Sequence, residues 1–262
     1  RALLVVEMVQ ALRIQMPRLG TRKLYSLLHP SLNKLGVGRD KLFRILRANH
    51  LLIKPLKSYH KTTNSLHRFR KHKNLVENMK PMRPEQLWVA DITYVGTRSN
   101  PMYLSLVTDA YSKKIVGYHL SKSLATKGSL IALQMGIKKR KYKRSALIHH
   151  SDRGFQYCSD AYQELLSKNT IKCSMTESYD PYANAIAERI NGILKQEFLT
   201  FSKTSDFTVM KQIIKESIHV YNTRRPHYSC HYNTPNFMHQ QKHIKIKSYK
   251  AKKHFKNVLE VL

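Results

Sequence analysis

The feature that most constrains the fold is an apolar run, Leu87 to Val95, that carries a carboxylate near its middle. The run, LWVADITYV, is rich in β-branched residues and is predicted to be a buried strand. Two further strand-like runs follow at hairpin spacing, at residues 102–109 and 114–120. Asp91 lies inside the first run, where a charge is costly unless it has a partner or a function. The run therefore predicts both a sheet and a candidate functional residue.

Helices and strands alternate after this hairpin. We expect helices over residues 125–138, 160–166, 181–198 and 207–221, and strands over residues 147–150 and 171–175. Asp180 and Pro181 suit the start of the third of these helices, because Asp caps a helix and Pro is tolerated in the first turn. Three strands followed by helix, strand, helix, strand and long helices indicate an α/β core.

Upstream of this core, residues 1–53 are predicted to be helical. Helices over residues 21–28 and 39–49 flank a stretch that contains Pro30, Gly36 and Gly38. The second helix has an apolar face, and its basic residues are Arg39, Lys41, Arg44 and Arg47. This pattern suits a helix-turn-helix module that binds DNA through these four residues. An ordinary helical pair with a solvated basic face explains the pattern equally well.

These observations divide the chain into four parts. Residues 1–53 form the helix-turn-helix-like DNA-binding segment, and residues 54–83 form a basic linker. Residues 84–240 form the core, and residues 241–262 form a basic tail that is expected to be poorly ordered.

The charge balance predicts a polyanionic partner. The 262 residues include 47 Lys and Arg against 16 Asp and Glu, a formal net charge of +31. A compact protein with this charge repels itself unless a polyanion such as DNA is its usual partner. The sequence predicts no membrane span and no signal peptide. Because the sequence begins at Arg1, we expect a fragment or unusual initiation, and three widely spaced cysteines predict a reducing cytosol without disulfides.

Three acidic residues are spaced as candidates for one site. Asp91 lies in the first strand, Asp152 follows a strand end, where α/β sheets bind ligands, and Glu188 lies on the helix over residues 181–198. Sixty residues separate the first two, and 35 separate the last two. On a helical projection Glu188 and Lys195 share a polar face, which would present a carboxylate beside a phosphate-binding cation. An amphipathic surface helix with its usual polar side explains that face as well.

Five segments carry a specific resemblance. They are WVADITYV, VTDAYSKKIVGY, LIHHSDRGFQY, SYDPYANAIAERINGILKQE and YNTRRPHYSCHYNTPNF. With the 35-residue gap, they resemble the catalytic domain of retroviral-integrase-like transposases, and most closely the second-frame (orfB) transposases of the IS-three group of bacterial insertion sequences. The stretch from Pro17 to Ile53 resembles the helical DNA-binding segment of those proteins, so the resemblance covers roughly residues 15–240. One departure is Cys230, where the family usually has Leu, at a position expected to pack.

The resemblance implies a ribonuclease-H-like integrase core at residues 84–240, with a mixed five-stranded sheet flanked by helices. It implies a DDE transposase that binds element ends, then cleaves and joins DNA strands. Asp91, Asp152 and Glu188 would hold two Mg²⁺ or Mn²⁺ ions, and Lys195 would contact a DNA phosphate near the cut. The implied partners are double-stranded DNA (the terminal inverted repeats and the target), further copies of the chain on that DNA, and a first-frame (orfA) protein or fusion. The implied location is the nucleoid in a bacterial cytoplasm.

Two other functions compete with this one. A DNA-binding regulator derived from a transposase would lack turnover, and the intact set of three carboxylates argues against it. A plain nuclease of the ribonuclease-H-like fold would share the carboxylates but would not need the helical arm or the basic tail.

Several other polar residues are expected to be structural. Asp109 is predicted to cap a turn, and His149 and His150 to pack or to bond the backbone. Zinc at His227, Cys230 and His231 is disfavoured because no second CxxC or HxxxH pair exists. The run YNTRRPH, at residues 221–227, is expected to brace the core, although contact with DNA is the alternative.

Overall fold

The computed structural model describes residues 1–54, 56, 72–77, 79–97, 99–176, 184–202 and 204–247. Most of the predicted linker and tail lies outside these residues, and so do Asp180 and Pro181, the predicted helix start. Within the described part of the chain, no helix has the length and apolar composition needed to cross a membrane.

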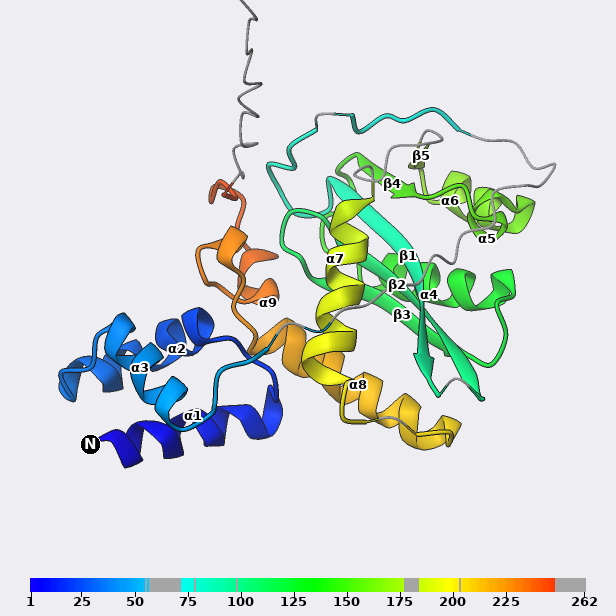
Figure 1. Cartoon of the computed structure of the whole chain (residues 1–262). Helices are drawn as coiled ribbons and strands as arrows, with labels where there is room; N and C mark the ends of the chain where they lie inside the picture. The colour runs from blue at the N-terminus through cyan, green and yellow to red at the C-terminus, as the bar shows by residue number, and fades with distance from the viewer. Residues whose placement is uncertain are drawn as a thin grey trace, which may run out of the picture.

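A five-stranded mixed sheet forms the centre of the molecule (Figure 1). Its strands are β1 (Leu87–Gly96), β2 (Pro101–Asp109), β3 (Ile115–Ser121), β4 (Leu147–Ser151) and β5 (Ile171–Met175). The order across the sheet is β3-β2-β1-β4-β5. β2 runs antiparallel to its neighbours β1 and β3, whereas β4 and β5 run parallel to β1. All five predicted strands are confirmed, with ends that differ by at most one residue.

Helices cover both faces of the sheet, which explains why the first residues of β1 are all buried rather than alternating. One face packs against α4 (Thr126–Lys138), α5 (Phe155–Cys158) and α6 (Asp160–Lys168), around Trp88, Leu133 and Tyr162. The other face packs against α7 (Ala185–Ile193), a π-helical turn (Leu194–Phe198) and α8 (Phe207–Thr223). Figure 1 shows α7 lying across the strands.

The close contact between α4 and β3 depends on a glycine. A Cβ atom at Gly117 would lie 2.0 Å from the carbonyl oxygen of Ala132 on α4. Only a residue without a side chain allows this approach of helix and strand.

The N-terminal residues form three helices, α1 (Ala2–Gln15), α2 (Thr21–Lys34) and α3 (Arg39–Ala48). Their buried residues, such as Val5, Leu24 and Leu42, belong to the same apolar cluster as α7 and α8. Figure 1 places these helices beside the C-terminal elements, η2 (Tyr228–Cys230) and α9 (Pro235–Met238).

The prediction that α2 ends at Leu28 is wrong, because the helix runs through Pro30 to Lys34. Continuing the helix buries Leu32 completely, which offsets the backbone hydrogen bond lost at proline. Gly36, two residues beyond the end of the helix, has a φ of 62°, which only glycine adopts readily. The N–H groups of Gly36 and Val37 donate to the carbonyls of Asn33 and Leu32, which is the Schellman arrangement.

Candidate active site

The parallel pairing of β1 with β4 places Asp91 and Asp152 at the same level of the sheet. The last paired residues are Val89 and His150, and Asp91 and Asp152 each follow two residues later in the chain. Because β4 ends at Ser151, Asp152 leaves the sheet at its carboxyl edge, where open α/β sheets bind ligands. The strand register therefore brings to the same level of the sheet two acids that sixty residues separate in the chain.

The helix α7 crosses β1 beside these two acids and is held there by two asparagines. The side-chain amide of Asn184 donates to the carbonyl oxygen of Ala90 at 3.0 Å, and that of Asn191 donates to Oδ2 of Asp91 at 2.7 Å. Glu188 is one helical turn from each asparagine, so the face of α7 that carries it is the face pinned to β1. Its side chain is exposed.

Asp91 is electrostatically strained. Burial, the negative charge of Asp152 and, more weakly, that of Glu188 raise the pKa of Asp91 to about 7. Hydrogen bonds from the N–H of Ile92 and from Asn191 oppose this shift but do not cancel it. The shift identifies an acid that is short of positive charge, which is a frequent property of functional sites.

Asp152 is oriented by the loop that follows β4. The backbone N–H of Gly154 donates to Oδ1 of Asp152 at 3.0 Å. A Cβ atom at Gly154 would lie 3.0 Å from that same oxygen, a distance at which the carboxylate would have to shift. The glycine in the sequence SDRG therefore lets the backbone hold the carboxylate at close range.

Lys195 follows on the π-helical turn that continues α7. Burial lowers the pKa of its ammonium group, whereas the negative charge of Asp91 raises it, so the two residues lie within electrostatic reach. The wider turn is closed by the N–H of Leu199, which donates to the carbonyl of Leu194 at 3.0 Å. Single π-helical turns inside helices are frequent at functional sites.

The donor set of this edge suits a hard divalent cation. Asp91, Asp152 and Glu188 offer carboxylate oxygens, and the buried Oδ1 atoms of Asn184 and Asn191 have no hydrogen-bond partner among the described residues. Within that same part of the chain, no three His, Cys, Asp or Glu side chains gather closely enough to enclose one ion together. The carboxylates are thus arranged around Asp91 rather than packed into a closed cage.

The other residues singled out in the sequence have separate places. Arg39, Lys41, Arg44 and Arg47 are all exposed along α3. His149 and His150 are buried and bond the hydroxyls of Tyr162 and Ser174, each at 2.9 Å. These two histidines therefore pack, as expected, but their hydrogen bonds are to side chains.

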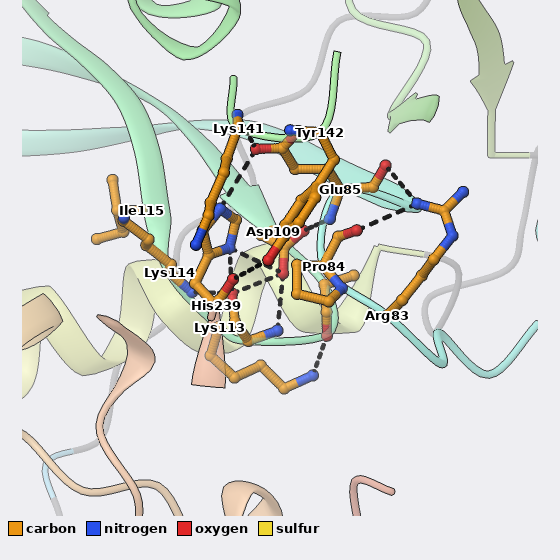
Figure 2. Close-up of polar contacts among 12 residues, drawn as sticks. Arg83, Pro84, Glu85, Asp109, Lys113, Lys114, Ile115, Lys141, Tyr142 and His239 are labelled. Atoms are coloured by element: carbon orange, nitrogen blue, oxygen red, sulfur yellow. Dashed lines mark hydrogen bonds and ion pairs between the residues drawn. The ribbon is translucent and has the colours of Figure 1, made fainter. Parts of the chain in front are cut away.

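The predicted capping role of Asp109 is confirmed, and Asp109 also belongs to a buried polar cluster that the sequence did not indicate (Figure 2). Its Oδ1 accepts hydrogen bonds from the N–H and hydroxyl of Ser112, and its Oδ2 accepts one from the N–H of Glu85 at 2.7 Å. His239 lies between Asp109 and Glu85, 3.7 Å from the first and 3.4 Å from the second. All four side chains are buried. We call this set the histidine clamp.

A second buried cluster joins the N-terminal helices to the core. Arg225, in the run YNTRRPH, is completely buried and donates to both oxygens of Glu197 at 2.7 and 2.8 Å. Lys23 on α2 reaches the same carboxylate at 3.4 Å. Glu197 lies on the π-helical turn, two residues after Lys195. The bracing role expected for YNTRRPH therefore extends to the N-terminal arm.

The three residues considered for zinc, His227, Cys230 and His231, each contact a different part of the protein. His227 contacts Arg225 at 3.0 Å, Cys230 is buried against the backbone of Ser112, and His231 bonds the carbonyl of Lys245. These three side chains have separate partners. The expected packing of Cys230 is confirmed.

The mixed sheet, the helices on both faces and the acids at its carboxyl edge define a polynucleotidyl transferase core of the ribonuclease-H-like class. Family models described as "Integrase core domain" match residues 81–181 and residues 169–235. A 31 kDa protein of insertion element IS600 from Shigella sonnei, itself called uncharacterized, is 35% identical over 79% of this chain and 76% of that protein. The chain belongs to the family of insertion-sequence transposases of the IS-three group.

Two more comparisons agree with this assignment. The transposase of insertion sequence element IS629 from Shigella sonnei is 36% identical over 55% of this chain, and the match spans about half of that protein, 48%. A chain of the simian T-cell lymphotropic virus intasome, solved in complex with the PP2A regulatory subunit B56 gamma, superposes with a TM-score of 0.55. At 20% identity over 88% of this chain and 78% of that one, it is similar in fold. Integrases and DDE transposases as a class act on DNA with divalent metal ions.

Proposed function

We propose that this chain binds the ends of an insertion sequence and that it cleaves DNA strands there and joins them to a target. One observation carries the proposal. Asp91 and Asp152 share a level of the sheet beside the helix of Glu188, and burial and the neighbouring charges raise the pKa of Asp91 to about 7. Carboxylates held near one another against their own repulsion are suited to a divalent cation.

Asp91, Asp152 and Glu188 would be the metal ligands, for two Mg²⁺ or Mn²⁺ ions. Such ions, when bound, neutralise the charge that develops on a phosphoryl group during in-line transfer. The protein's own contribution is orientation. Asn191 fixes the carboxylate of Asp91, and Gly154 fixes that of Asp152.

The reaction needs no covalent intermediate on the protein. Water attacks a phosphodiester at the element end and frees a 3′-hydroxyl, which then attacks a phosphodiester of the target and displaces a 3′-hydroxyl of the target strand. Lys195 would hold a phosphate beside the cut, because its ammonium group lies within reach of the charge on Asp91. Arg39, Lys41, Arg44 and Arg47 would bind the element end through the exposed side of α3.

The four-part division fits this function. Residues 1–53 would bind DNA, residues 54–83 link, residues 84–240 carry out the chemistry, and the basic tail at residues 241–262 adds non-specific affinity. The partners would be the terminal inverted repeats, the target duplex, further copies of this chain on that DNA, and a first-frame (orfA) protein or fusion. The place of action would be the nucleoid in a bacterial cytoplasm.

Cleavage of DNA that flanks the coding frame tests the proposal. The wild-type chain, with the first-frame protein supplied, should cut at the inverted repeats in Mg²⁺ or Mn²⁺. Glu188→Gln should still bind that DNA but lose cleavage, whereas Glu164→Gln, an exposed acid on α6, should cleave normally. Specific binding by the wild type with no cleavage in either metal would instead support the inactive regulator.

A further inference from the structure

A basic and aromatic groove lies between the N-terminal helices and a turn near the C-terminal end of the core. Its volume is about 590 Å³, and its lining includes Arg22, Tyr25, His29, Arg39, Tyr228 and Tyr232. One wall is α2 with the first residue of α3, and the other wall is the turn that contains η2. We call it the arm–turn groove. Its lining residues contain no carboxylate.

Each wall of the arm–turn groove carries a pair of rings. On α2, Tyr25 and His29 meet edge to face with ring centroids 5.4 Å apart. On the turn, Tyr228 and Tyr232 meet edge to face at 5.7 Å. The ammonium group of Lys247 lies 4.5 Å from the ring centroid of Tyr228, which adds a cation to that wall. Both walls of the groove therefore carry aromatic rings and cations.

The turn holds an unusual backbone conformation. His231 and Tyr232 both have positive φ angles, 53° and 63°, which cost non-glycine residues about 1–2 kcal/mol each. Hydrogen bonds maintain the conformation: the N–H of Tyr232 donates to the carbonyl of His227 at 2.8 Å, and the N–H of His227 donates to the carbonyl of Asn233 at 3.1 Å. Backbone strain of this kind is concentrated at binding sites, because the surrounding structure must hold it.

We propose that the arm–turn groove binds unpaired nucleotides of a DNA strand. The inference rests on the proposed function, since it presumes that DNA is the ligand. A duplex is too wide to enter a space of about 590 Å³, which is in the range of pockets for small ligands. A base released from its stack can enter, and stacking on an aromatic side chain contributes about 1–3 kcal/mol per base.

The chemistry of the two walls assigns a role to each. Arg22 binds a phosphate, because guanidinium groups form paired hydrogen bonds with phosphate oxygens. Tyr228 and Tyr232 stack on the bases, which every base permits, so binding is independent of sequence. The strand bridges the arm and the core, whereas the exposed side of α3 remains available to a duplex.

Fluorescence anisotropy with two DNAs tests the inference on the full chain without metal. One DNA is a blunt duplex, and the other is the same duplex with a short single-stranded tail of dT. The wild type should prefer the tailed DNA, and Tyr228→Ala and Tyr232→Ala should each reduce this preference by about tenfold. Tyr228→Phe should retain it, because the ring is kept. Phe237→Ala is the matched control: Phe237 is 46% exposed, Tyr228 is 44% exposed, and Phe237 does not line the groove.

The outcomes separate the inference from the function on which it rests. If the wild type binds both DNAs equally, or if both alanine variants keep the preference, the arm–turn groove does not bind unpaired nucleotides, while the proposed transposase function stands. If the wild type binds neither DNA, this inference fails, and the cleavage assay with the first-frame protein decides the proposed function separately. Arg22→Ala should make the salt dependence shallower by about one phosphate contact for the tailed DNA alone, and an equal change with the blunt duplex would assign Arg22 to duplex binding and overturn its role here.

Discussion

Asp91 and Asp109 stand on neighbouring strands of one sheet, yet the pKa values of their carboxyl groups shift in opposite directions. Burial raises the pKa of Asp91, and the charges of Asp152 and Glu188 raise it further, to about 7. Burial alone would raise the pKa of Asp109 too, but His239 and Ser112 more than offset it and lower that pKa. The number of donors and the sign of the neighbouring charges, rather than burial, therefore separate the two acids.

The opposite pKa shifts distinguish acids that stabilise the fold from acids that are suited to bind a cation. In the histidine clamp, Asp109 and Glu85 receive backbone N–H groups and lie against His239, so their charges are compensated within the protein. At the carboxyl edge of the sheet, Asp91 receives two neutral donors and faces two negative charges. The first arrangement stabilises the fold, and the second stores repulsion that a cation would relieve.

Asp91→Asn should give the largest effect, and it tests the contrast between Asp91 and Asp109 most directly. Cleavage of element ends should fall by at least about a thousandfold, because a metal ligand is lost. The same substitution should raise the thermal stability of the metal-free chain at pH 8, because a strained charge is removed. Cleavage assays and thermal unfolding on one preparation measure both effects. Wild-type cleavage by this variant would remove Asp91 from the site.

His239→Ala should give the next largest effect, and its sign on stability is opposite. It removes the cation that lies between Asp109 and Glu85 and leaves Glu85 with Arg140 at 3.5 Å as its remaining ion pair, and breaking a buried ion pair costs about 3–5 kcal/mol. Urea unfolding at pH 6 measures the loss. His243→Ala, at an exposed histidine four residues further along the chain, is the control. Equal stability of the two variants would show that the clamp contributes nothing to the fold.

The pH dependence of the free energy of unfolding should distinguish Asp91 from Asp109. The pKa of Asp91 in the folded protein, about 7, lies above the ordinary aspartate pKa of 3.8, so its contribution to stability falls as pH rises from about 4 to about 7. Between pH 5 and pH 8 the wild type should therefore lose about 2 kcal/mol more than Asp91→Asn. Urea unfolding at the two pH values measures this difference. At pH 8, Mg²⁺ should stabilise the wild type but not the variant.

The histidine clamp should change the stability of the protein over other ranges of pH. Its acids have lowered pKa values, so their contribution is present above the ordinary range of a carboxyl group and is lost as pH falls through the lowered values. Burial alone would lower the pKa of His239, but Asp109 and Glu85 raise it overall, so its contribution is present below about pH 6.5 and is lost as pH rises through the raised value. A His239→Ala chain with the same loss of stability above pH 6.5 as the wild type would contradict this assignment.

The sequence was sufficient for the sheet because its signals are local. The β-branched run around Asp91 and the hairpin spacing after it predict strands wherever the chain later places them. The histidine clamp was not predictable in this way, because Glu85, Asp109 and His239 are far apart in the chain and no spacing rule links them. Glu197 was missed for the same reason: its partners Arg225 and Lys23 are 28 and 174 residues away. A fully buried arginine in YNTRRPH is a signal of such a partner, but the sequence does not reveal burial.

Substitution of Lys195 should give the smallest effect, and it tests whether a cation beside the carboxylate of Asp91 contributes to DNA binding. It follows α7 on the π-helical turn, within reach of the charge on Asp91 and two residues before Glu197. Lys195→Ala should weaken binding to element-end DNA by about tenfold and should make the salt dependence of binding shallower by about one, because one phosphate contact is lost. Lys195→Arg should recover part of the loss, since the charge returns with a different donor geometry. Lys211→Ala, at an exposed lysine on α8, is the control for a general loss of positive charge. If Lys195→Ala and Lys211→Ala shift the salt dependence equally, Lys195 acts only as part of the protein's overall positive field. The negative charge around Asp91 would then be neutralised by the metal ions alone.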